Sequence, residues 1–439
     1  MDIEPRLATA NANFAQLQQK VKDLEQGLAD KQNELTTKRT RLLQCHAVIQ
    51  ELENQRLTAL AEKSALTPNS MTFAGFYQGM PGWCNINRSM MREFHKRGID
   101  VRLDPYLTEY RPDPVTTQLE EQFFHGLINK PFDPNALYFN SAITHLLKPN
   151  YPSKYKVACT MFESAKGLPE FYRSICNAFN EVWIPSRRCC KLYQDAGVVR
   201  PLHVFPLFVD VNKFRPVPPL GELVSNTFKF GAVGWMTARK GFNILLKAYF
   251  TAFNYSDEVE LVFHPYLPWG NSDAEKEKFH ALIKDIGSGW DKLLPKVTVV
   301  DRIFTQEEMS SWYSGLDWLV CSSRGEGAYM PGLEAMACGV PLLYPSALEL
   351  EYAKPTNSLG YYVEGTKVAD DALCELTDAY RGLEFYEPSW EDLAKQMRFV
   401  FENRLDLTEA CIHSVQEYSA DVGGQRMVDH LTEIFALFR

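Results

Sequence analysis

Segments typical of strands and helices alternate along most of this chain, starting at residue 71. Met71–Tyr77 is a short apolar run that predicts a strand. The turn-forming residues GMPG follow it, and the helical stretch after them is ended by Gly98 before the next apolar run, 99–103. A strand, a helix and a second strand in succession predict parallel pairing. We therefore expect an α/β fold with its ligand-binding loops at the carboxyl ends of the strands.

A proline-rich segment, 216–226 (PVPPLGELVSN), interrupts this alternation and divides it into two domains, 71–215 and 227–405. The chain has 439 residues, enough for each domain to bury its own core. Residues 406–439 end in an amphipathic helix after Gly423-Gly424, which we expect to cross back to the first domain; docking of its apolar face on a membrane is the alternative. Further strands are expected at 136–140, 156–161, 181–184, 229–233, 260–264, 297–300, 318–321 and 342–344.

Residues 1–66 follow a different pattern, an apolar repeat of seven residues that predicts a coiled coil. At ~1.5 Å per residue such a helix is about 90 Å long. Lys31, Lys38 and Arg56 fall on the seam, where charged residues weaken the zipper and fix its register. We expect this stalk to drive self-association; a helical hairpin folded against the rest of the chain is the alternative. The first seam position is occupied by Leu7, Phe14, Val21, Leu28, Leu35, Leu42 and Ile49.

Composition excludes several classes of protein. A formal charge of -9 and a pI of about 5.6 argue against a general nucleic-acid binder. The ten cysteines include no C-x-x-C pair, which indicates a reducing compartment and no zinc site. The N-terminus has no leader pattern, and no apolar run approaches the ~18 residues of a spanning helix. We expect a cytoplasmic protein with at most peripheral membrane contact.

The most informative motif is the segment 325–341, GEGAYMPGLEAMACGVP. It predicts a loop, a short helix and then a buried strand, with Pro331 at the first helical position and Gly339 as the left-handed residue after the helix. The N–H groups of Gly332 and Leu333 would then lie at the positive end of the helix dipole. A diphosphate is the natural ligand of such a site.

Two glutamates flank that anion site, eight positions apart. Glu334, in the first helical turn, suits a vicinal diol such as the 2′ and 3′ hydroxyls of ribose, because an ionised carboxylate accepts two hydrogen bonds. Glu326, before the helix, would reach hydroxyls on the other side of the diphosphate. One carboxylate for a nucleoside and one for a sugar indicate a nucleotide-sugar donor.

At these residues the sequence resembles the family four retaining glycosyltransferases, whose signature E-x-x-x-x-x-x-x-E followed by A-M-A-C-G-x-P matches 326–341. The resemblance extends from residue 71 to the C-terminus and is strongest over 229–345. It implies the GT-B fold, in which two Rossmann-like domains face a cleft, with the donor in the second domain and the acceptor in the first. It also implies transfer of a sugar, with retention of configuration, to a hydroxyl of a glycan, a lipid-linked sugar or a protein.

The loop 234–241 (GWMTARKG) resembles the family's G-R-x-x-x-x-K-G segment, whose arginine and lysine bind the donor diphosphate. Lys240 matches the lysine, while Trp235 replaces the arginine. We expect the adjacent Arg239 to supply the lost charge. The chain has no D-x-D motif to hold a metal, so these cations and the helix amides would stabilise the departing diphosphate without a metal or another cofactor.

The expected site has three parts. The catalytic group comprises Glu326, Lys240 and Arg239. The donor-binding residues are Glu334, Gly327, Pro331, Gly332, Leu333 and Gly234. Acceptor contacts and positioning are expected from His145, Glu163 and Gly82, and the resemblance implies no separate base, because the departing phosphate oxygen can accept the acceptor's proton.

Two departures from the family pattern support other interpretations. Phe208 stands where the linker at the domain junction has glycine, and Trp235 replaces the arginine noted above. Both favour a coiled-coil scaffold whose transferase domains have lost catalysis. A GT-B relative that epimerises or phosphorolyses a sugar is a third interpretation.

Overall fold

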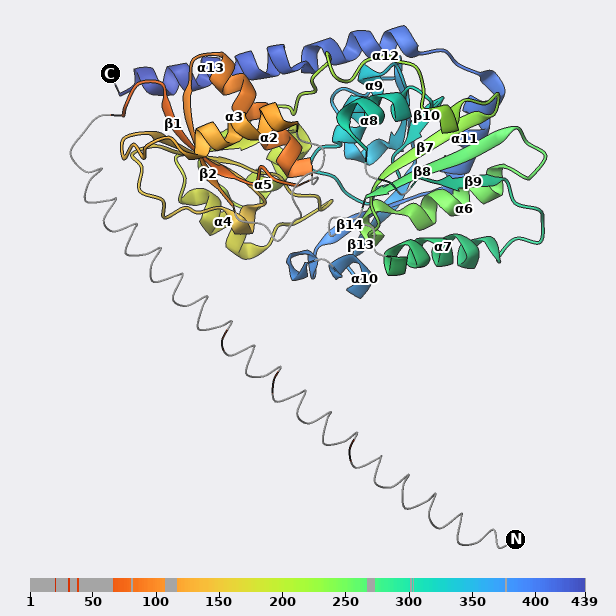
Figure 1. Cartoon of the computed structure of the whole chain (residues 1–439). Helices are drawn as coiled ribbons and strands as arrows, with labels where there is room; N and C mark the ends of the chain where they lie inside the picture. Colours follow the sequence, from red (N-terminus) through yellow and green to blue (C-terminus); the bar gives the residue numbers. More distant parts are fainter. Residues whose placement is uncertain are drawn as a thin grey trace, which may run out of the picture. The chain divides into compact units, whose positions relative to one another are not determined.

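The computed structural model divides the chain into two compact units, 1–63 and 64–439. In the first unit only Lys20, Lys31 and Lys38, all helical and exposed, are described, so the predicted coiled coil lies outside the described residues. In the second unit two six-stranded sheets follow one another along the chain (Figure 1). The described residues of this unit are 66–79, 82–106, 117–266, 273–300, 302, 304–375 and 377–438.

The first sheet has the strand order β2-β1-β3-β4-β5-β6, and every neighbouring pair is parallel. Its central strands are buried on both faces, as a parallel sheet covered by helices requires. All carboxyl ends therefore lie at one edge. The strands are β1 (Ser70–Gly75), β2 (Asp100–Pro105), β3 (Leu137–Ser141), β4 (Lys156–Cys159), β5 (Glu181–Ile184) and β6 (Leu202–Val204).

Helices cover both faces of this sheet because each presents one apolar side. On α2, Ile86, Met90 and Phe94 recur four residues apart and pack in one core cluster with α3 and α13. The other face is covered by α4 and α5. The bounds are α2 (Gly82–Lys96), α3 (Gln118–Ile128), α4 (Glu170–Asn177), α5 (Arg187–Asp195) and α13 (Ala420–Ala436).

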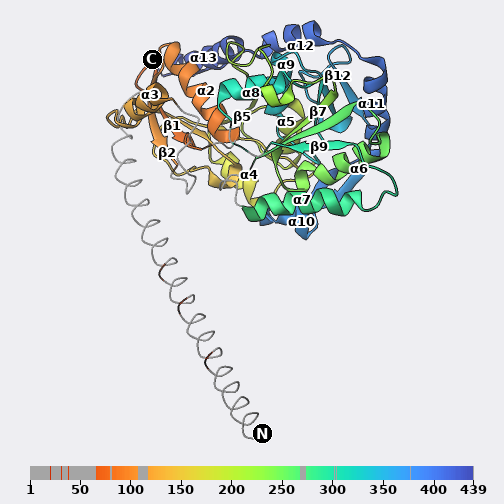
Figure 2. The ribbon, with the colours of Figure 1, turned by 45° about the vertical axis from the view of Figure 1, so that its right-hand side comes forward.

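The second sheet has the order β12-β11-β10-β7-β8-β9, again with parallel neighbours. One face packs on α6, α7 and α11, and the other on α8, α9 and α12 (Figure 2). The strands are β7 (Phe228–Trp235), β8 (Val259–Tyr266), β9 (Lys296–Val299), β10 (Trp318–Val320), β11 (Leu342–Pro345) and β12 (Ser358–Tyr361). The helices are α6 (Phe242–Ala252), α7 (Asp273–Gly287), α8 (Gln306–Tyr313), α9 (Met330–Ala337), α11 (Trp390–Asn403) and α12 (Thr408–Ser414).

A two-stranded antiparallel hairpin, β13 (Val363–Val368) and β14 (Glu384–Pro388), follows the second sheet. The short helix α10 (Asp371–Cys374) lies between its strands and packs in the core cluster of the first domain. The amide of Ala165 donates to the Glu384 carbonyl at 2.8 Å. The hairpin segment is thus continuous in sequence with the second domain and packs against the first.

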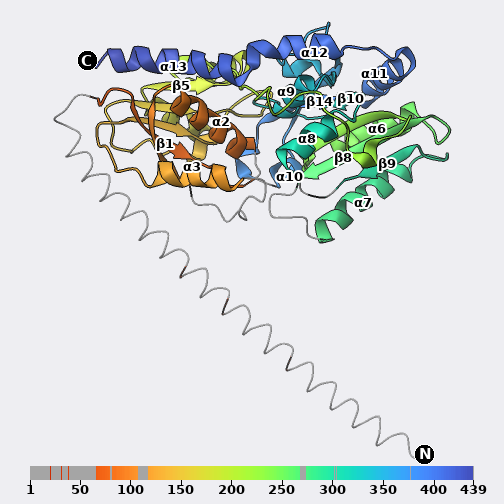
Figure 3. The same cartoon turned by 45° about the horizontal axis from the view of Figure 1, so that its top comes forward.

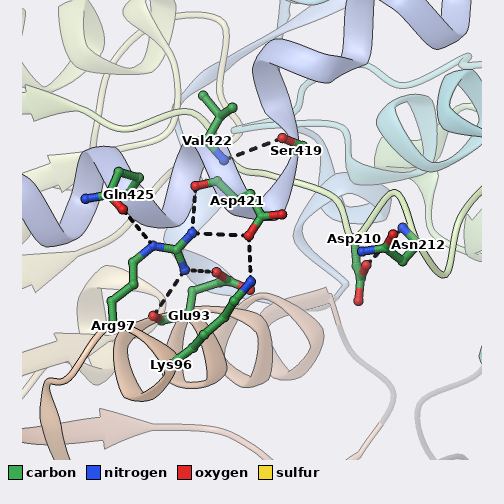
Figure 4. Close-up of polar contacts among 9 residues, drawn as sticks. All are labelled: Glu93, Lys96, Arg97, Asp210, Asn212, Ser419, Asp421, Val422 and Gln425. Atoms are coloured by element: carbon green, nitrogen blue, oxygen red, sulfur yellow. Dashed lines mark hydrogen bonds and ion pairs between the residues drawn. The ribbon is translucent and has the colours of Figure 1, made fainter.

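The last helix, α13, runs along the first domain beside α2 (Figure 3). Its start is fixed by polar contacts with the end of α2 (Figure 4). Arg97, the residue after α2, donates to the Asp421 carbonyl at 2.8 Å and to Gln425 at 3.2 Å, and Lys96 pairs with Asp421 at 2.6 Å. The apolar face packs in the first-domain core through Met427, Leu431, Ile434 and Phe435. Among the described helices, none combines the length and the apolar character needed to cross a bilayer.

The expected break at Gly423-Gly424 is wrong, because α13 begins earlier, at Ala420, and includes both glycines. They serve close packing instead. A Cβ atom added at Gly423 would lie 2.5 Å from the ring of Phe208, and one added at Gly424 would lie 2.7 Å from Cβ of Glu93. Phe208 is buried against this helix, so the linker position where the family has glycine carries a core side chain here.

Replacing Gly423 by alanine should destabilise the protein by about 1–2 kcal/mol. The added methyl overpacks Phe208, and this cost outweighs the ~1 kcal/mol by which alanine favours a helix over glycine. Urea unfolding measures the difference. Gly126→Ala is the matched control, since nothing lies within 4 Å of an added Cβ there; it should stabilise by about 0.5–1 kcal/mol. Equal stabilisation by both substitutions would contradict the packing described.

Candidate functional site

The second sheet reverses its strand order between β7 and β10, where open α/β sheets bind their ligands. β7 ends at Trp235 and leads into a helical turn, Ala238–Lys240. β10 ends at Val320 and leads into the loop 321–329, which contains the first glutamate of the motif. The topology therefore brings the two motifs of the second domain together.

Backbone contacts lock the turn after β7 to the loop after β10. Gly241 has φ 66° and lies so close to this loop that a Cβ atom would be 2.1 Å from the Ser322 carbonyl oxygen, so only glycine fits. The amide of Arg324 donates to the Arg239 carbonyl at 2.7 Å, and the Ser322 hydroxyl donates to the Lys240 carbonyl at 2.8 Å. These contacts hold the side chains of Arg239 and Lys240 beside the loop.

Both cations contact Glu326, whose side chain is only 6% exposed. Lys240 Nζ lies 2.6 Å from Oε1, and Arg239 Nη1 lies 3.2 Å from Oε2 and 2.5 Å from the Gly325 carbonyl oxygen. Burial opposes ionisation of Glu326, but the charges of Lys240 and Arg239 outweigh it and lower its pKa below the ordinary value. Glu326 likewise outweighs burial and raises the pKa of Arg239. Both shifts favour the ionised forms of Glu326 and Arg239.

Glu334 lies apart from that cluster, at a cavity of about 230 Å³. Its Oε2 accepts a hydrogen bond from the hydroxyl of Tyr313 at 2.8 Å. Burial raises the pKa of Glu334 to about 7, only partly offset by this hydrogen bond. The two glutamates of one motif thus lie in opposite electrostatic environments.

Two details of helix α9 correct the sequence analysis. The helix begins at Met330, so Pro331 occupies its second position. The amide of Gly332 donates to the Tyr329 carbonyl at 3.1 Å, so it is already bonded within the first turn. Gly339 has the expected left-handed conformation, with φ 83°.

The expected donor-binding residues face two different cavities. Gly234, Pro331 and Glu334 line the large one. Gly327 and Leu333 line a smaller one of about 20 Å³ at the contact with the first domain. Lys240 adjoins the large cavity, because its side chain packs over Gly234, where a Cβ atom would lie 3.4 Å from Lys240 Cε.

Sequence reasoning missed the first-domain wall of the large cavity. Arg88 and Arg92 lie four residues apart on α2, which places them on the same face of that helix. Arg88 donates to the carbonyls of Tyr77 and Gly79, at 2.7 and 3.1 Å, and so fixes the loop after β1. Arg92 pairs with Glu120. The sequence contained one signal for these residues, the four-residue spacing of the two arginines after the first loop, which predicts that they share a helix face. The missed lining residues include Asn85, Arg88, Arg92, Lys213, His264 and Phe304.

The expected acceptor residues do not line that cavity. His145 is exposed, and its Nδ1 lies 2.8 Å from the Tyr172 hydroxyl. Gly82 is exposed at the start of α2. Glu163 alone reaches the cluster: its carboxylate accepts from Tyr380 at 3.3 Å and contributes to the field at Arg239.

The first domain also holds the Glu326 loop directly. Ser186 Oγ donates to the Gly327 carbonyl at 3.1 Å, and Arg188 donates to the Glu326 carbonyl and, at 2.9 Å, to the Ser164 carbonyl. These contacts anchor the main chain on both sides of the Glu326 carboxylate.

Comparison with known families identifies the domain that carries this cluster. Residues 227–374, which include Lys240, Glu326 and Glu334, match the family described as Glycosyl transferases group 1. A proposed glycosyltransferase, ORF315 of Acidianus bottle-shaped virus (isolate Italy/Pozzuoli), is 32% identical over 110 residues, which cover 23% of this chain and 34% of that protein. The chain thus matches about a third of the length of this curated relative.

Solved structures establish the fold of the wider unit. Sucrose-phosphate synthase from Thermosynechococcus elongatus superposes with a TM-score of 0.58 at 15% identity, covering 84% of this chain and 99% of that one. An α,α-trehalose 6-phosphate synthase from Burkholderia multivorans gives 0.57 at 10% identity, covering 85% and 99%. The two parallel-sheet domains have the GT-B fold, which confirms the expected fold class.

Replacing Glu334 by glutamine should stabilise the protein at pH 8 by about 3 kcal/mol, because the wild-type carboxylate must ionise in a buried site. Its pKa is raised from 4.5 to about 7, so the wild-type free energy of unfolding falls as the pH rises between these values. At pH 4.5 the difference between the two proteins should largely disappear. Urea unfolding at both pH values measures it. Glu277→Gln, at an exposed position of α7, is the control. A gain that is equal at both pH values would contradict the raised pKa.

Proposed function

We propose that this protein transfers a sugar from a nucleoside-diphosphate sugar to an acceptor hydroxyl, with retention of anomeric configuration and without a metal at the donor phosphates. The observation that carries the proposal is the ionised group of Lys240, Arg239 and Glu326 beside the cavity that contains Glu334, within a glycosyl transferases group 1 domain. A cation for phosphate and two separated carboxylates for hydroxyls match the three parts of such a donor.

The nucleoside belongs in the large cavity. Phe304 and His264, whose rings are stacked 4.2 Å apart, supply apolar surface for a base, and Glu334 accepts from the ribose hydroxyls. The diphosphate then lies toward Gly234, within reach of Lys240. The transferred sugar points to Glu326. Lys240 and Glu326 pair with each other before the donor binds. When the donor binds, Lys240 contacts the phosphate and Glu326 accepts hydrogen bonds from the sugar hydroxyls. These new contacts compensate the two charges to a similar extent.

In the proposed reaction the bond between the sugar carbon and the phosphate oxygen breaks, and its electron pair stays on the phosphate. The acceptor oxygen forms its bond on the same face, and its proton passes to the departing phosphate oxygen. Lys240 stabilises the negative charge that develops there. Both oxygens of Glu326 contact cations and its pKa is lowered, so this carboxylate suits orientation of the sugar better than proton abstraction.

Arg239 acts in this proposal as a positioning residue. Its guanidinium contacts the Gly325 carbonyl and the Glu326 carboxylate, and both contacts fix the direction of that carboxylate. The sequence analysis assigned it to the phosphate in place of the arginine lost at Trp235. The contacts described favour an indirect role, with Lys240 as the cation nearest the diphosphate.

The acceptor enters from the first domain. Arg88, Arg92 and Lys213 line that side of the cavity together with Asp210. This mixture of donors and acceptors of hydrogen bonds suits a hydroxyl-rich acceptor such as a glycan or a lipid-linked sugar. The proposal also keeps self-association through residues 1–66 and a cytoplasmic location.

The second candidate function is a scaffold without catalysis, which Trp235 favours. The other departure, Phe208, carries less weight because Gly423 accommodates its ring on α13. Thermal shift against UDP, GDP, ADP and CMP separates the candidates: stabilisation by one of them supports the transferase, and no stabilisation by any supports the scaffold.

Replacing Lys240 by methionine should lower kcat by about 10²–10³-fold, because the variant loses the cation that stabilises the leaving diphosphate. The assay measures nucleoside diphosphate release from a panel of donors with a glycan extract as acceptor, and NMR of the product reports anomeric configuration. Lys247→Met, at an exposed position of α6, is the matched control and should keep full activity.

Two outcomes of that assay would contradict the proposal. An inverted product would exclude retention. A rate that rises several-fold on addition of Mg²⁺ or Mn²⁺ would exclude metal independence. In the proposed reaction Lys240 already stabilises the charge of the departing diphosphate, so an added metal ion should not raise the rate.

A further inference from the structure

Three possible metal ligands meet at a place that the proposed reaction does not use. Glu181 is the first residue of β5, His203 lies in β6, and His430 lies in α13. One ligand atom from each lies within 4.8 Å of the other two. Glu181 is at the amino end of its strand, whereas the donor cavity adjoins the carboxyl ends of the other sheet.

The carboxylate of Glu181 is 2% exposed and already has one neutral donor on each oxygen. Trp183 Nε1 donates to Oε1 at 2.6 Å, and the Tyr155 hydroxyl donates to Oε2 at 3.0 Å. A carboxylate has about four lone-pair sites, so each oxygen keeps one for another partner. Both imidazoles lie near these oxygens: His430 Nε2 is 3.0 Å from Oε1 and 3.2 Å from Oε2, and His203 Nε2 is 3.5 Å from Oε2.

The distances between the ligand atoms match a shared cation. One oxygen of Glu181, Oε2, lies near both imidazoles: it is 3.2 Å from His430 Nε2 and 3.5 Å from His203 Nε2. The edges of a tetrahedron around a metal with ligands at ~2.0–2.1 Å measure about 3.3 Å. A separation of 3.5 Å is long for a direct hydrogen bond. We propose that Glu181, His203 and His430 bind a first-row divalent cation of the Zn²⁺ type, with water as the fourth ligand.

The surroundings of His430 support the same assignment. Its other ring nitrogen, Nδ1, lies 3.4 Å from the carboxylate of Glu433, one helical turn away on α13. This separation is also long for a hydrogen bond, but it places a carboxylate where metal-bound histidines usually have a partner for the second ring nitrogen. Two imidazoles and one carboxylate are a donor set that suits zinc better than calcium or magnesium.

The absence of paired cysteines in the sequence argues against a zinc site formed by a local motif. It does not apply to a site formed by residues from three segments that are far apart in the sequence. The bound cation would join the crossing helix α13 to two neighbouring strands of the first sheet. Its role would be to fix this helix on the first domain. This inference is independent of the proposed transferase activity, since none of the three residues lines the donor cavity.

The test uses the full-length protein, freed of metal by dialysis against a chelator and titrated with ZnCl₂ by calorimetry. Wild type should bind one Zn²⁺ per chain at this site. His203→Gln should weaken that binding by at least about tenfold. His203 is the preferred substitution, because His430 still compensates the buried Glu181, and circular dichroism checks the fold. His413→Gln, which removes an exposed imidazole from α12, is the matched control and should bind as wild type does.

Two further readouts distinguish this site from binding by thiols, since eight described cysteines other than Cys84 are free. Zn²⁺ should raise the melting temperature of wild type and of His413→Gln, but not that of His203→Gln. Co²⁺ should give a visible spectrum without a thiolate charge-transfer band. Equal Zn²⁺ affinity in wild type and His203→Gln, or a thiolate band with Co²⁺, would overturn the proposal and leave the cluster as a buried ion pair.

Discussion

The structure depends on one close contact between main chains. A Cβ atom at Gly325 would lie 1.9 Å from the carbonyl oxygen of Glu163, so the loop after β10 can touch the first domain only because this residue has no side chain. On its other side the same loop donates and accepts backbone hydrogen bonds with the turn after β7 and with β14. The main chain next to Glu326 is therefore in contact with main chain from both domains. Its geometry follows from sterics before any charge is considered.

The two glutamates of the motif show how surroundings divide one chemical group into two roles. Glu326 is buried beside two cations, and its pKa falls. Glu334 is buried beside a phenol, and its pKa rises to about 7. The first carboxylate has a charge that its neighbours fully compensate, whereas the second is poised to change its charge when hydrogen-bond donors enter the cavity. The spacing of the two glutamates in the sequence gives no information on this difference in pKa.

The parallel strands were predictable because burial on both faces leaves short continuous apolar runs, as at 181–184, where the expected and observed bounds agree. The hairpin at 363–388 was missed, since β13 is largely exposed and carries no such run. The prediction of a helix break at Gly423-Gly424 was wrong because the sequence does not show that other side chains pack closely against these two glycines. The spacing of Arg88 and Arg92 predicts a shared helix face but not the cavity that this face lines. No local pattern predicts that His264 lines the same cavity. The metal cluster combines residues 181, 203 and 430, which no local pattern connects.

The return of α13 to the first domain has a mechanical consequence. The chain passes between the two sheets at Val209 and again just before α13, and these two crossings are hydrogen-bonded to each other. Val209 donates to the Tyr418 carbonyl and accepts from the Ala420 amide, both at 2.9 Å. Because they are paired in this way, the two crossings form a single hinge. A rotation of the domains about this pair would part Gly325 from Glu163, and would also part the hairpin segment 363–388 from the core of the first domain.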